Sequence, residues 1–530
     1  MKKLLSISVV FCSLTAVAQD SFMNEQALNN SSDVIGTSRY VGMGGAMGAL
    51  GADMSVISWN PAGIGMYRKN DVAITFGGLW GKSHIEEERR GIGTLDQVGM
   101  VYSMPTDSEI CPYVNFGFNY QKKKNFFANF YADNPNLFGI SQMDQLAELA
   151  SYDLASSYNL AGLVYRNNAL TPVPGQAGKF YNKYDGEFNN FTHHSEGSLR
   201  SWDFNVSTNI QDRYYLGLTF GVDNIDFSGI TDYYEGSSYI DDQGEKKYGN
   251  YSIWNDYRIS GYGFNFKLGG IVRPFVDNSF RVGLVVESPT WYKLKSDIYM
   301  DYTDEVSNPV VRSQMEESYL EYNICTPWKF RAMMGSTVGS MFAWDIDYEY
   351  ANYASMSQRY PKYYNTYGGI KDLDMNRHMR ENLKGVHTIR AGVEVRPVAP
   401  LAFRLGYNFS TSAYDQNAHF DQICFDNGDY FNSPALDYTT RTNFMVTKPA
   451  HILCLGMGYK WKHFYFDLAY KLRHQKADFY AFDDSFIYNS EFMDNFRESH
   501  PGATASDIFL APVPVDLTRH SITCTLGVKF

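Results

Sequence analysis

Long apolar runs are missing from almost the whole of this 530-residue chain. Beyond its amino terminus, no stretch approaches the ~20 consecutive apolar residues that a membrane-spanning helix requires. The mean hydropathy is −0.34. These two observations exclude a helical membrane protein.

Cysteine and basic charge are also scarce. The six cysteines are scattered, and no two have the Cys-x-x-Cys spacing of a metal or redox site. We therefore predict no disulfide framework and no zinc site, and the sequence indicates no cofactor. Lysine and arginine total 46 against 58 aspartates and glutamates, without a basic stripe. This charge balance excludes nucleic acid as a partner.

The amino terminus carries the one short apolar run. Lys2 and Lys3 precede apolar residues 4–11, and Ala16 and Ala18 provide the small side chains that a signal peptidase reads. A basic start, a short apolar core and a small-residue end are typical of a secretory signal peptide. We predict that residues 1–18 are a signal peptide cleaved after Ala18 and that the protein is exported.

Aromatic residues and glycine are abundant, with 41 Tyr, 36 Phe and 44 Gly. Tyr and Phe favour strands and membrane interfaces. Apolar and polar residues alternate over segments of about ten residues, as they do in transmembrane barrel strands. The last such segment has an apolar row that should face lipid and a polar row that should face the lumen. These rows are Ile522, Cys524, Leu526, Val528 and Phe530, and Ser521, Thr523, Thr525, Gly527 and Lys529.

The alternating segments predict an all-β fold, a transmembrane antiparallel β-barrel of about 14 strands, because bacterial barrels have an even number of strands. A soluble β-sandwich is the competing interpretation, but one closed barrel better accounts for a long chain with no visible linker. The predicted strands are 70–80, 94–104, 112–121, 199–210, 213–228, 256–273, 278–299, 317–336, 339–353, 385–397, 399–412, 448–460, 462–475 and 517–530.

The connections between these strands are of two kinds. Short breaks, which predict tight turns, alternate with long Tyr-rich loops, and we expect a short helix at 143–157 in the first loop. This asymmetry is typical of the periplasmic and extracellular ends of a membrane barrel. The short breaks lie at 211–212, 274–278, 338–340, 397–400 and 460–462, and the long loops at 121–198, 353–384, 412–447 and 476–516.

The chain ends on an aromatic residue, Phe530, which completes the apolar row of the last strand. This ending resembles the C-terminal signal that the barrel-assembly machinery recognises. We therefore expect an outer-membrane location, with outer-membrane lipid and the assembly machinery as partners, and a monomeric barrel of residues 70–530.

Residues 19–69, before the first strand, combine a glycine-rich run with an Asn-Pro turn. Glycine lets backbones pack closely and turn sharply, and proline holds the residue before it extended. A dinucleotide-binding fingerprint is excluded because Met47 stands where the third glycine belongs and no strand precedes the run. The residues concerned are Gly42, Gly44 and Gly45, and Asn60, Pro61, Ala62 and Gly63.

This region resembles the plug of the FadL-type outer-membrane transporters, which combines a glycine-rich run, a downstream acid and an Asn-Pro-Ala element. The resemblance is specific over residues 36–69 and only architectural over the barrel. It implies a 19–69 plug in the lumen and passive transport of hydrophobic compounds, such as long-chain fatty acids, detergents or lipids. It also implies lateral release beside a kinked third strand, where Gly117 is the candidate kink residue. A glycine that only makes room for the plug is the alternative.

Charged residues are expected on the lumen side of several strands. Asp345, Asp347 and Glu349 share one face of a strand, and Arg390 and Arg404 follow on later strands. Opposite charges on neighbouring strands can pair across the wall and anchor a plug. Alternatively, Arg390 or Arg404 binds the carboxylate of a fatty acid.

Other functions are less well supported. The histidines, including His193 and His194, have no metalloprotease or hydrolase spacing, so we predict no enzyme. A transporter of haem or another ligand on the same scaffold, and a surface adhesin that uses the long loops, remain as alternatives.

Overall fold

The architecture is described from a computed structural model that covers residues 33–81, 92–151, 159–241, 243–305, 314–361, 369–415, 418, 442–482 and 510–530. The predicted signal peptide, residues 1–18, and the start of the predicted plug lie outside these residues.

The strands form one closed antiparallel β-barrel of 14 strands, as predicted. Four of these strands consist of two consecutive segments each: β3 with β4, β10 with β11, β12 with β13, and β21 with β22. The wall closes where the first strand, β1, pairs with the last, β22. The wall segments are β1 (Asp71–Gly81), β2 (Ile92–Pro105), β3 (Tyr113–Asn125), β4 (Ala128–Asn134), β7 (Asp185–Ile210), β8 (Tyr214–Ile240), β9 (Lys246–Val272), β10 (Arg281–Glu287), β11 (Trp291–Asp304), β12 (Gln314–Cys325), β13 (Lys329–Val338), β14 (Phe342–Asn352), β17 (Gly385–Val398), β18 (Leu401–Ser410), β19 (Phe444–Trp461), β20 (Phe464–Tyr480), β21 (Val513–Asp516) and β22 (Arg519–Lys529).

Short elements occupy the lumen and the long-loop end. The described helices and minor strands are α2 (Ser38–Gly42), η1 (Met54–Ser58), η2 (Pro61–Met66), α3 (Gln142–Ser151), α4 (Leu160–Arg166), β5 (Thr171–Pro172), β6 (Phe180–Tyr181), η4 (Tyr353–Ser355), β15 (Ser357–Tyr360), β16 (Ile370–Lys371) and α5 (Leu373–Asn382). None of the described helices is long and apolar enough to cross a membrane.

Alternation along the strands sorts side chains between the two faces of the wall. On β18, Phe403, Leu405 and Tyr407 are 43–49% exposed, whereas Arg404 and Asn408 between them are buried. The last strand behaves in the same way, so the predicted outward row and inward row are confirmed there. Along these strands the outer face is therefore apolar and the inner face polar, as in a transmembrane barrel.

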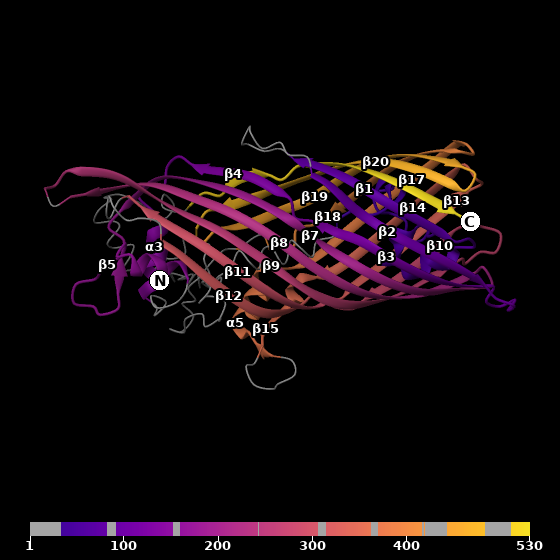
Figure 1. Ribbon diagram of the computed structural model, residues 1–530, viewed down its shortest axis with the longest axis horizontal. Helices are drawn as coiled ribbons and strands as arrows, with labels where there is room; N and C mark the ends of the chain where they lie inside the picture. Colours follow the sequence, from indigo (N-terminus) through magenta and orange to yellow (C-terminus); the bar gives the residue numbers. More distant parts are fainter. Residues whose placement is uncertain are drawn as a thin grey trace, which may run out of the picture.

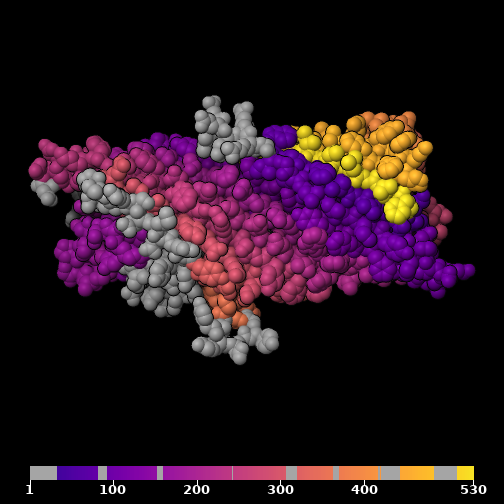
Figure 2. Space-filling model, in the orientation of Figure 1, coloured from indigo at the N-terminus to yellow at the C-terminus, as the bar shows by residue number. Residues whose placement is uncertain are grey.

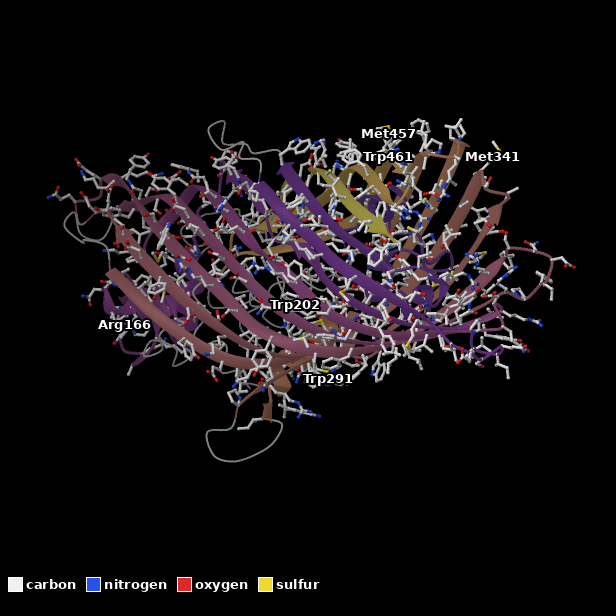
Figure 3. All side chains as sticks on the ribbon, turned by 45° about the vertical axis from the view of Figure 1, so that its right-hand side comes forward. Arg166, Trp202, Trp291, Met341, Met457 and Trp461 are labelled. Carbon is white, nitrogen blue, oxygen red and sulfur yellow. The ribbon has the colours of Figure 1, made fainter. Side chains whose placement is uncertain are left out.

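Exposed aromatic and methionine side chains are spread over the outer wall, and Figure 3 labels some of them at two levels. Trp461, Met457 and Met341 lie near the short-turn end, and Trp202 and Trp291 lie about midway along the barrel. Amphipathic aromatic rings concentrate at membrane–water interfaces. The wall between these levels thus has the character of a lipid-facing band.

All five predicted short turns connect neighbouring antiparallel strands, so the pairing of strands at this end is confirmed. Two predicted strands, 278–299 and 317–336, are instead broken at Pro289 and Pro327. Proline cannot donate a ladder hydrogen bond. Side-chain hydroxyls bridge the breaks: the Ser288 hydroxyl accepts from the Phe266 N–H at 2.9 Å.

Three neighbouring strands are much longer than predicted. β7, β8 and β9 have 26, 27 and 27 residues and extend far toward the long-loop end of the barrel (Figure 1). The additional residues of β7 belong to the predicted 121–198 loop. Those of β8 and β9 belong to the predicted connection between positions 228 and 256. The predicted helix at 143–157 is observed as α3, Gln142–Ser151.

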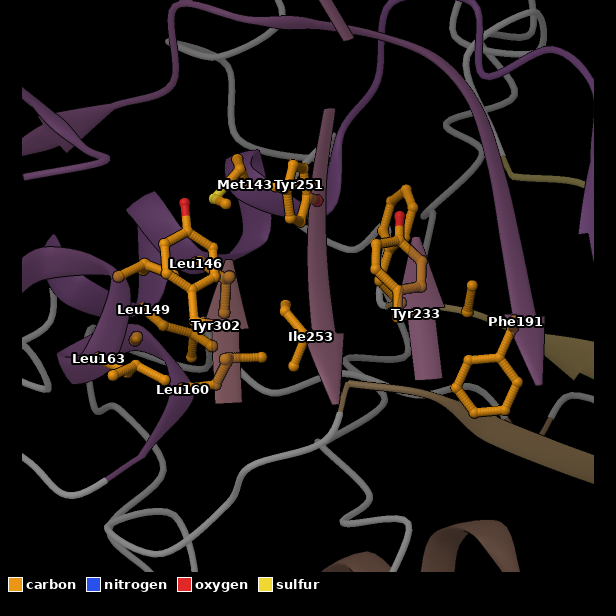
Figure 4. Packing of buried hydrophobic residues seen from close by; sticks show 14 of the residues in the cluster. Met143, Leu146, Leu149, Leu160, Leu163, Phe191, Tyr233, Tyr251, Ile253 and Tyr302 are labelled. Atoms are coloured by element: carbon orange, nitrogen blue, oxygen red, sulfur yellow. The ribbon is translucent and has the colours of Figure 1, made fainter. Parts of the chain in front are cut away.

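Buried apolar residues form layers along the barrel. At the long-loop end, α3 and α4 pack on inward residues of β7, β8, β9 and β11, among them Phe191, Tyr233, Tyr251 and Tyr302 (Figure 4). A second cluster fills the upper lumen between the long strands and α5. A third forms between residues 34–67 and the lower wall.

Candidate functional site

Residues 33–70, which we call the inner segment, lie inside the barrel. The Ser38 N–H donates to Thr525 of β22 at 2.7 Å, and the Ile64 carbonyl accepts from Asn115 of β3 at 2.8 Å. The Leu50 carbonyl accepts from Arg281 of β10 at 3.0 Å. Because these strands lie on different sides of the wall, the segment crosses the whole lumen.

The glycine-rich run lies directly against the wall, as its composition predicted. Gly44 and Gly45 have φ of +66° and +79°, a left-handed conformation that favours glycine. A Cβ on Gly44 would lie 2.7 Å from the Tyr407 backbone nitrogen, and one on Gly42 would lie 2.9 Å from Cα of Gly456. Any larger residue would push the segment off β18 and β19.

Two inward aspartates of β14 bind the backbone that follows this run. Asp345 accepts from the N–H groups of Ala49 and Leu50 at 3.0 and 2.7 Å, and Asp347 accepts from Gly48 at 3.2 Å. Consecutive N–H groups converging on a carboxylate make a charge-assisted contact. The row of acids predicted on this strand thus anchors the inner segment.

The Asn-Pro turn packs on the wall through its small residues. Asn60 caps η2 by accepting from the Ala62 N–H at 3.2 Å, and its amide donates to the Gly48 carbonyl at 2.8 Å. Pro61 lies against Gly217 of β8. Asn60 itself faces Gly269 of β9, whereas Ile64 of η2 accepts a hydrogen bond from Asn115 of the third strand.

Arg390, one predicted carboxylate partner, is buried by the inner segment. Its guanidinium lies 3.5 Å from the Trp59 ring centroid and donates to the Tyr40 hydroxyl at 2.6 Å. The Arg331 guanidinium lies 4.2 Å from the centroid of the same Trp59 ring. It forms ion pairs with two buried glutamates, Glu287 at 2.5 Å and Glu349 at 2.6 Å.

Arg404, the other predicted partner, is occupied by carboxylates of the protein. It pairs with Glu394 at 2.6 Å and with Asp467 at 2.5 Å, and Glu394 also accepts from Arg39 of the inner segment at 3.1 Å. Two carboxylates satisfy the charge of Arg404, which favours the anchoring interpretation for this residue. Arg390 contacts the Trp59 ring, the Tyr40 hydroxyl and the Gly45 carbonyl of the inner segment, but has no ion pair within the described residues.

The third strand does not bend at Gly117. Pairing runs unbroken through Gly117 on both sides, with Val101 of β2 and Asn205 of β7. A Cβ there would lie 2.8 Å from Ile57 Cδ1 of η1. The alternative role, a glycine that makes room for the inner segment, matches this geometry.

The irregularity of the third strand lies farther along, where β3 leaves β2. Within the described residues, pairing of β2 with β3 ends at Gln97 and Gln121. Above that point β2 follows β1 as far as Ile92, whereas β3 follows β7 with a register shift between Lys122 and Lys124.

The continuation of the third strand leans toward the last strands of the barrel. Arg519 of β22 donates to the Asn125 and Phe127 carbonyls at 3.0 and 3.1 Å, and Phe130 of β4 packs on Phe479 of β20. The upper end of the β1–β2 hairpin therefore stands apart from β3. We call this separation the β2–β3 gap. In Figure 2 the hairpin (indigo) and β22 (yellow) lie side by side on one face.

A cavity of about 40 Å³ lies behind the β2–β3 gap. Its lining includes Leu79 and Thr94 of the hairpin, Asn125 of β3, and Arg473 and Arg519 of the opposite wall. The start of the inner segment, Asp33 to Ile35, also lines the cavity. The cavity thus lies between the β2–β3 gap and the start of the inner segment.

Two further cavities flank the inner segment. One of about 80 Å³ lies above it and is lined by charged residues such as Lys123 and Asp223, together with Tyr292 of the upper apolar cluster. The other, of about 140 Å³, lies below it near Pro400 and Lys460 of the short turns.

Sequence reasoning missed several residues of this site, among them Arg331, Arg473 and Arg519. The run Gln121-Lys122-Lys123-Lys124 breaks the polar–apolar alternation of the third strand and was the available signal for the β2–β3 gap. The predicted third strand in fact ended at 121, where its pairing with β2 ends.

No family model matches the chain, and no curated protein matches it either. Among solved structures, a FadL homologue of Pseudomonas aeruginosa is similar with a TM-score of 0.50 and 10% identity, over 94% of this chain and 99% of that chain. At this identity the likeness shows the fold, which is that of a FadL-type barrel.

Two other solved structures are similar at slightly lower scores. The monoaromatic hydrocarbon channel CymD has a TM-score of 0.48, and the toluene transporter TodX of Pseudomonas putida has a TM-score of 0.47. Each is 10% identical and covers 94% of this chain and 99% of its own.

Proposed function

We propose that this protein carries hydrophobic compounds passively across an outer membrane and releases them sideways through the β2–β3 gap. The single observation that carries the proposal is the end of β2–β3 pairing at Gln97 and Gln121, with a cavity directly behind it. An apolar compound that leaves here passes from the lumen to lipid without crossing water, which favours transfer by ~0.8 kcal/mol per CH₂ kept from water.

The lower lumen supports a sideways route. The inner segment is fixed by ion pairs and hydrogen bonds to strands on different sides of the wall, including Arg39–Glu394 and Leu50–Asp345. A route along the axis requires these contacts to break together. We therefore assign the inner segment the role of a plug, with Gly42, Gly44, Gly45 and the Asn60–Gly63 turn as its packing elements.

The upper lumen supports capture of apolar compounds. The cluster above the charged layer includes inward residues such as Ile225, Phe227, Ile259, Leu294 and Tyr322. Apolar side chains on the inside of a barrel are otherwise unfavourable for a water-filled channel. This chain also shares the fold of a FadL homologue. We therefore assign it a hydrophobic cargo.

The proposed function also requires that the chain is exported and assembled in the outer membrane. We infer cleavage after Ala18, both termini in the periplasm, and a monomeric barrel in the outer membrane. The apolar outer wall between the two levels of exposed aromatic residues supports insertion in lipid. Phe530 is the proposed signal for the barrel-assembly machinery.

The test is to fill the cavity behind the gap. Thr94 lines the cavity, whereas its neighbour Leu95 is 39% exposed on the outer wall. Thr94→Trp should lower oleate uptake by cells several-fold, and Leu95→Trp, which adds similar bulk on the lipid side, should not. Both variants must show normal heat-modifiability. Wild-type uptake by a folded Thr94→Trp barrel would refute lateral release.

A further inference from the structure

Three histidines on the outer wall repeat one arrangement, which we call the Tyr–His belt. Each histidine has a tyrosine on the neighbouring strand, two residues out of register, and the tyrosine hydroxyl lies 2.7 Å from Nδ1 of the imidazole. The three pairs occupy the neighbouring strands β14, β17, β18, β19, β20 and β22. The pairs are Tyr348 with His387, Tyr407 with His451, and Tyr470 with His520.

A second aromatic ring packs on each imidazole of the belt. The centroid distances are 5.1 Å for Tyr350 and His387, 5.2 Å for Phe409 and His451, and 5.8 Å for Trp80 and His520. The tyrosine hydroxyl and the packed ring together fix the orientation of each imidazole. Within the described residues, the second ring nitrogen, Nε2, has no hydrogen-bond partner in any of the three.

The belt lies at one height on the wall. Counting ten residues from each histidine toward the short-turn end reaches positions 397, 461 and 530, at or within one residue of the end of the strand. Ten residues span ~33 Å along a strand. Because barrel strands are tilted by ~35–45°, this length corresponds to a height of ~25 Å, which is that of a lipid-facing band. Trp461 marks the lower end of this distance on β19 (Figure 3).

The outward side chains change character at the belt. Below His451, the outward row of β19 is apolar or aromatic and 42–51% exposed, namely Leu453, Leu455, Met457 and Tyr459. Above it, the exposed residues include charged ones: Lys448 pairs with Asp478, and Lys476 is exposed on β20. The belt therefore lies where the lipid-facing band ends on the long-loop side.

An imidazole at this boundary offers more than an aromatic ring does. Tyrosine and tryptophan are sufficient for an interfacial girdle. When a tyrosine hydroxyl donates to Nδ1, however, the ring proton is on Nε2, which becomes a hydrogen-bond donor at the edge of the lipid. His387 and His451 are exposed and His520 is half-buried, so membrane lipid can reach these donors. Phosphate oxygens of lipid head groups are strong acceptors at this height.

The spacing of the belt suits a head group with more than one phosphate. Successive histidines are two strands apart, or ~10 Å at ~4.8 Å per strand. A disaccharide that carries a phosphate at each end can reach two of them at once. The leaflet on the long-loop side of an outer membrane contains glycolipid of this kind.

We propose that the Tyr–His belt binds the phosphorylated head group of a glycolipid in the outer leaflet, with Nε2 of His387, His451 and His520 as donors to phosphate oxygens. The inference rests on the proposed orientation of the barrel, with the long loops outside, but not on lateral release. The partner is a lipid of the surrounding membrane and is distinct from the transported compound.

The test compares lipids that differ in phosphate. The purified full-length barrel in dodecyl maltoside is titrated with diphosphoryl lipid A, with the same lipid A after phosphatase treatment, and with dioleoylphosphatidylglycerol, and bound lipid is counted by native mass spectrometry. We expect diphosphoryl lipid A to bind about tenfold more tightly than its dephosphorylated form, a difference of ~1.4 kcal/mol. One hydrogen bond to a charged group has an effect of this size.

Variants assign the effect to the belt. Changing His387, His451 and His520 together to Phe keeps an aromatic ring at each position but removes Nε2, so the preference for phosphate should be lost. The single variant His451→Phe should lose part of it and decides the question if the triple variant does not fold. His463→Phe is the matched control, because His463 is exposed at the short-turn end, where its Nδ1 lies 3.0 Å from the Lys529 carbonyl. Heat-modifiability checks folding.

The outcomes separate this inference from the proposed function. Equal binding of the two forms of lipid A by the wild type, or a folded His→Phe variant with an unchanged preference, overturns the phosphate site. Phosphatidylglycerol that binds as tightly as diphosphoryl lipid A overturns the assignment to a glycolipid. Oleate uptake by the triple variant should equal that of the wild type, whereas failure of the proposed function appears in the Thr94→Trp experiment.

Discussion

At the scale of the residue, inward polar side chains of the wall hold the inner segment rather than line a water-filled pore. Arg404 illustrates this role, because it joins Glu394 and Asp467 under the inner segment and all three are at most 7% exposed. Buried ion pairs contribute little over an apolar substitute, but breaking one leaves an uncompensated charge.

Arg404→Met should therefore destabilise the protein. Glu394 keeps Arg39 and Arg396, but Asp467 loses its 2.5 Å partner. We expect a loss of about 3 kcal/mol in the free energy of unfolding, measured from the urea midpoint. Arg404→Met combined with Asp467→Asn should recover part of it. Normal stability with weaker decanoate binding would instead establish Arg404 as a carboxylate ligand.

The residue scale is also where the sequence was most informative. Strict alternation on β18 predicts that Phe403 and Leu405 face outward and Arg404 inward, because successive side chains of a strand point to opposite faces. The partners of the inward charges were less predictable. Arg331 and Glu287 lie on two consecutive predicted strands, but which inward residues meet depends on the register of β10 against β13.

At the scale of the element, strand breaks and strand ends determine where the wall opens. Pro289 interrupts one predicted strand, and a proline within a strand is a visible signal. The departure of β3 from β2 after Gln121 has only the interrupted alternation at 121–124 as a local signal, which does not predict its direction. It depends on Arg519 and Phe479, contributed by the far end of the chain, which draw the third strand inward.

The Asn60 turn provides an element-scale prediction. Asn60→Ala removes both the cap on Ala62 and the hydrogen bond to the Gly48 carbonyl. It should lower the stability of the folded η2 turn by about 1–3 kcal/mol. Because the barrel strands do not depend on these bonds, we expect normal membrane levels but altered oleate uptake or leakage of small solutes.

A milder variant separates the two bonds. Asn60→Ser keeps a hydroxyl that can cap Ala62 but is too short to reach Gly48 as Asn60 does. An intermediate effect of Asn60→Ser is expected. If Asn60→Ala shows wild-type uptake and leakage in a well-folded barrel, the turn serves folding alone and does not control passage.

At the scale of the whole molecule, the barrel is taller on one side. Strands of 26 and 27 residues, as in β7 and β8, extend about 85–90 Å along their length at ~3.3 Å per residue. A lipid-facing band is only ~25 Å tall. Much of β7, β8 and β9 therefore lies beyond the membrane, where α3 and α4 pack against it.

The last residue extends the seam at which the barrel closes. The Phe530 N–H and carbonyl bond the Asn70 backbone at 3.1 and 3.0 Å, and the ring is 60% exposed on the outer wall. Deleting Phe530 should lower the heat-modifiable fraction in the membrane, whereas Phe530→Tyr should not. Unchanged assembly of the truncated chain would argue against a role of Phe530 in recognition.

The position of that seam also links the wall to the inner segment. The inner segment leads directly into β1 at Asn70, whose backbone bonds Phe530. The Ser38 N–H, near the other end of the segment, donates to Thr525 of the same last strand. A change in the final strand therefore alters two supports at once, the closure of the wall and the position of the segment inside it.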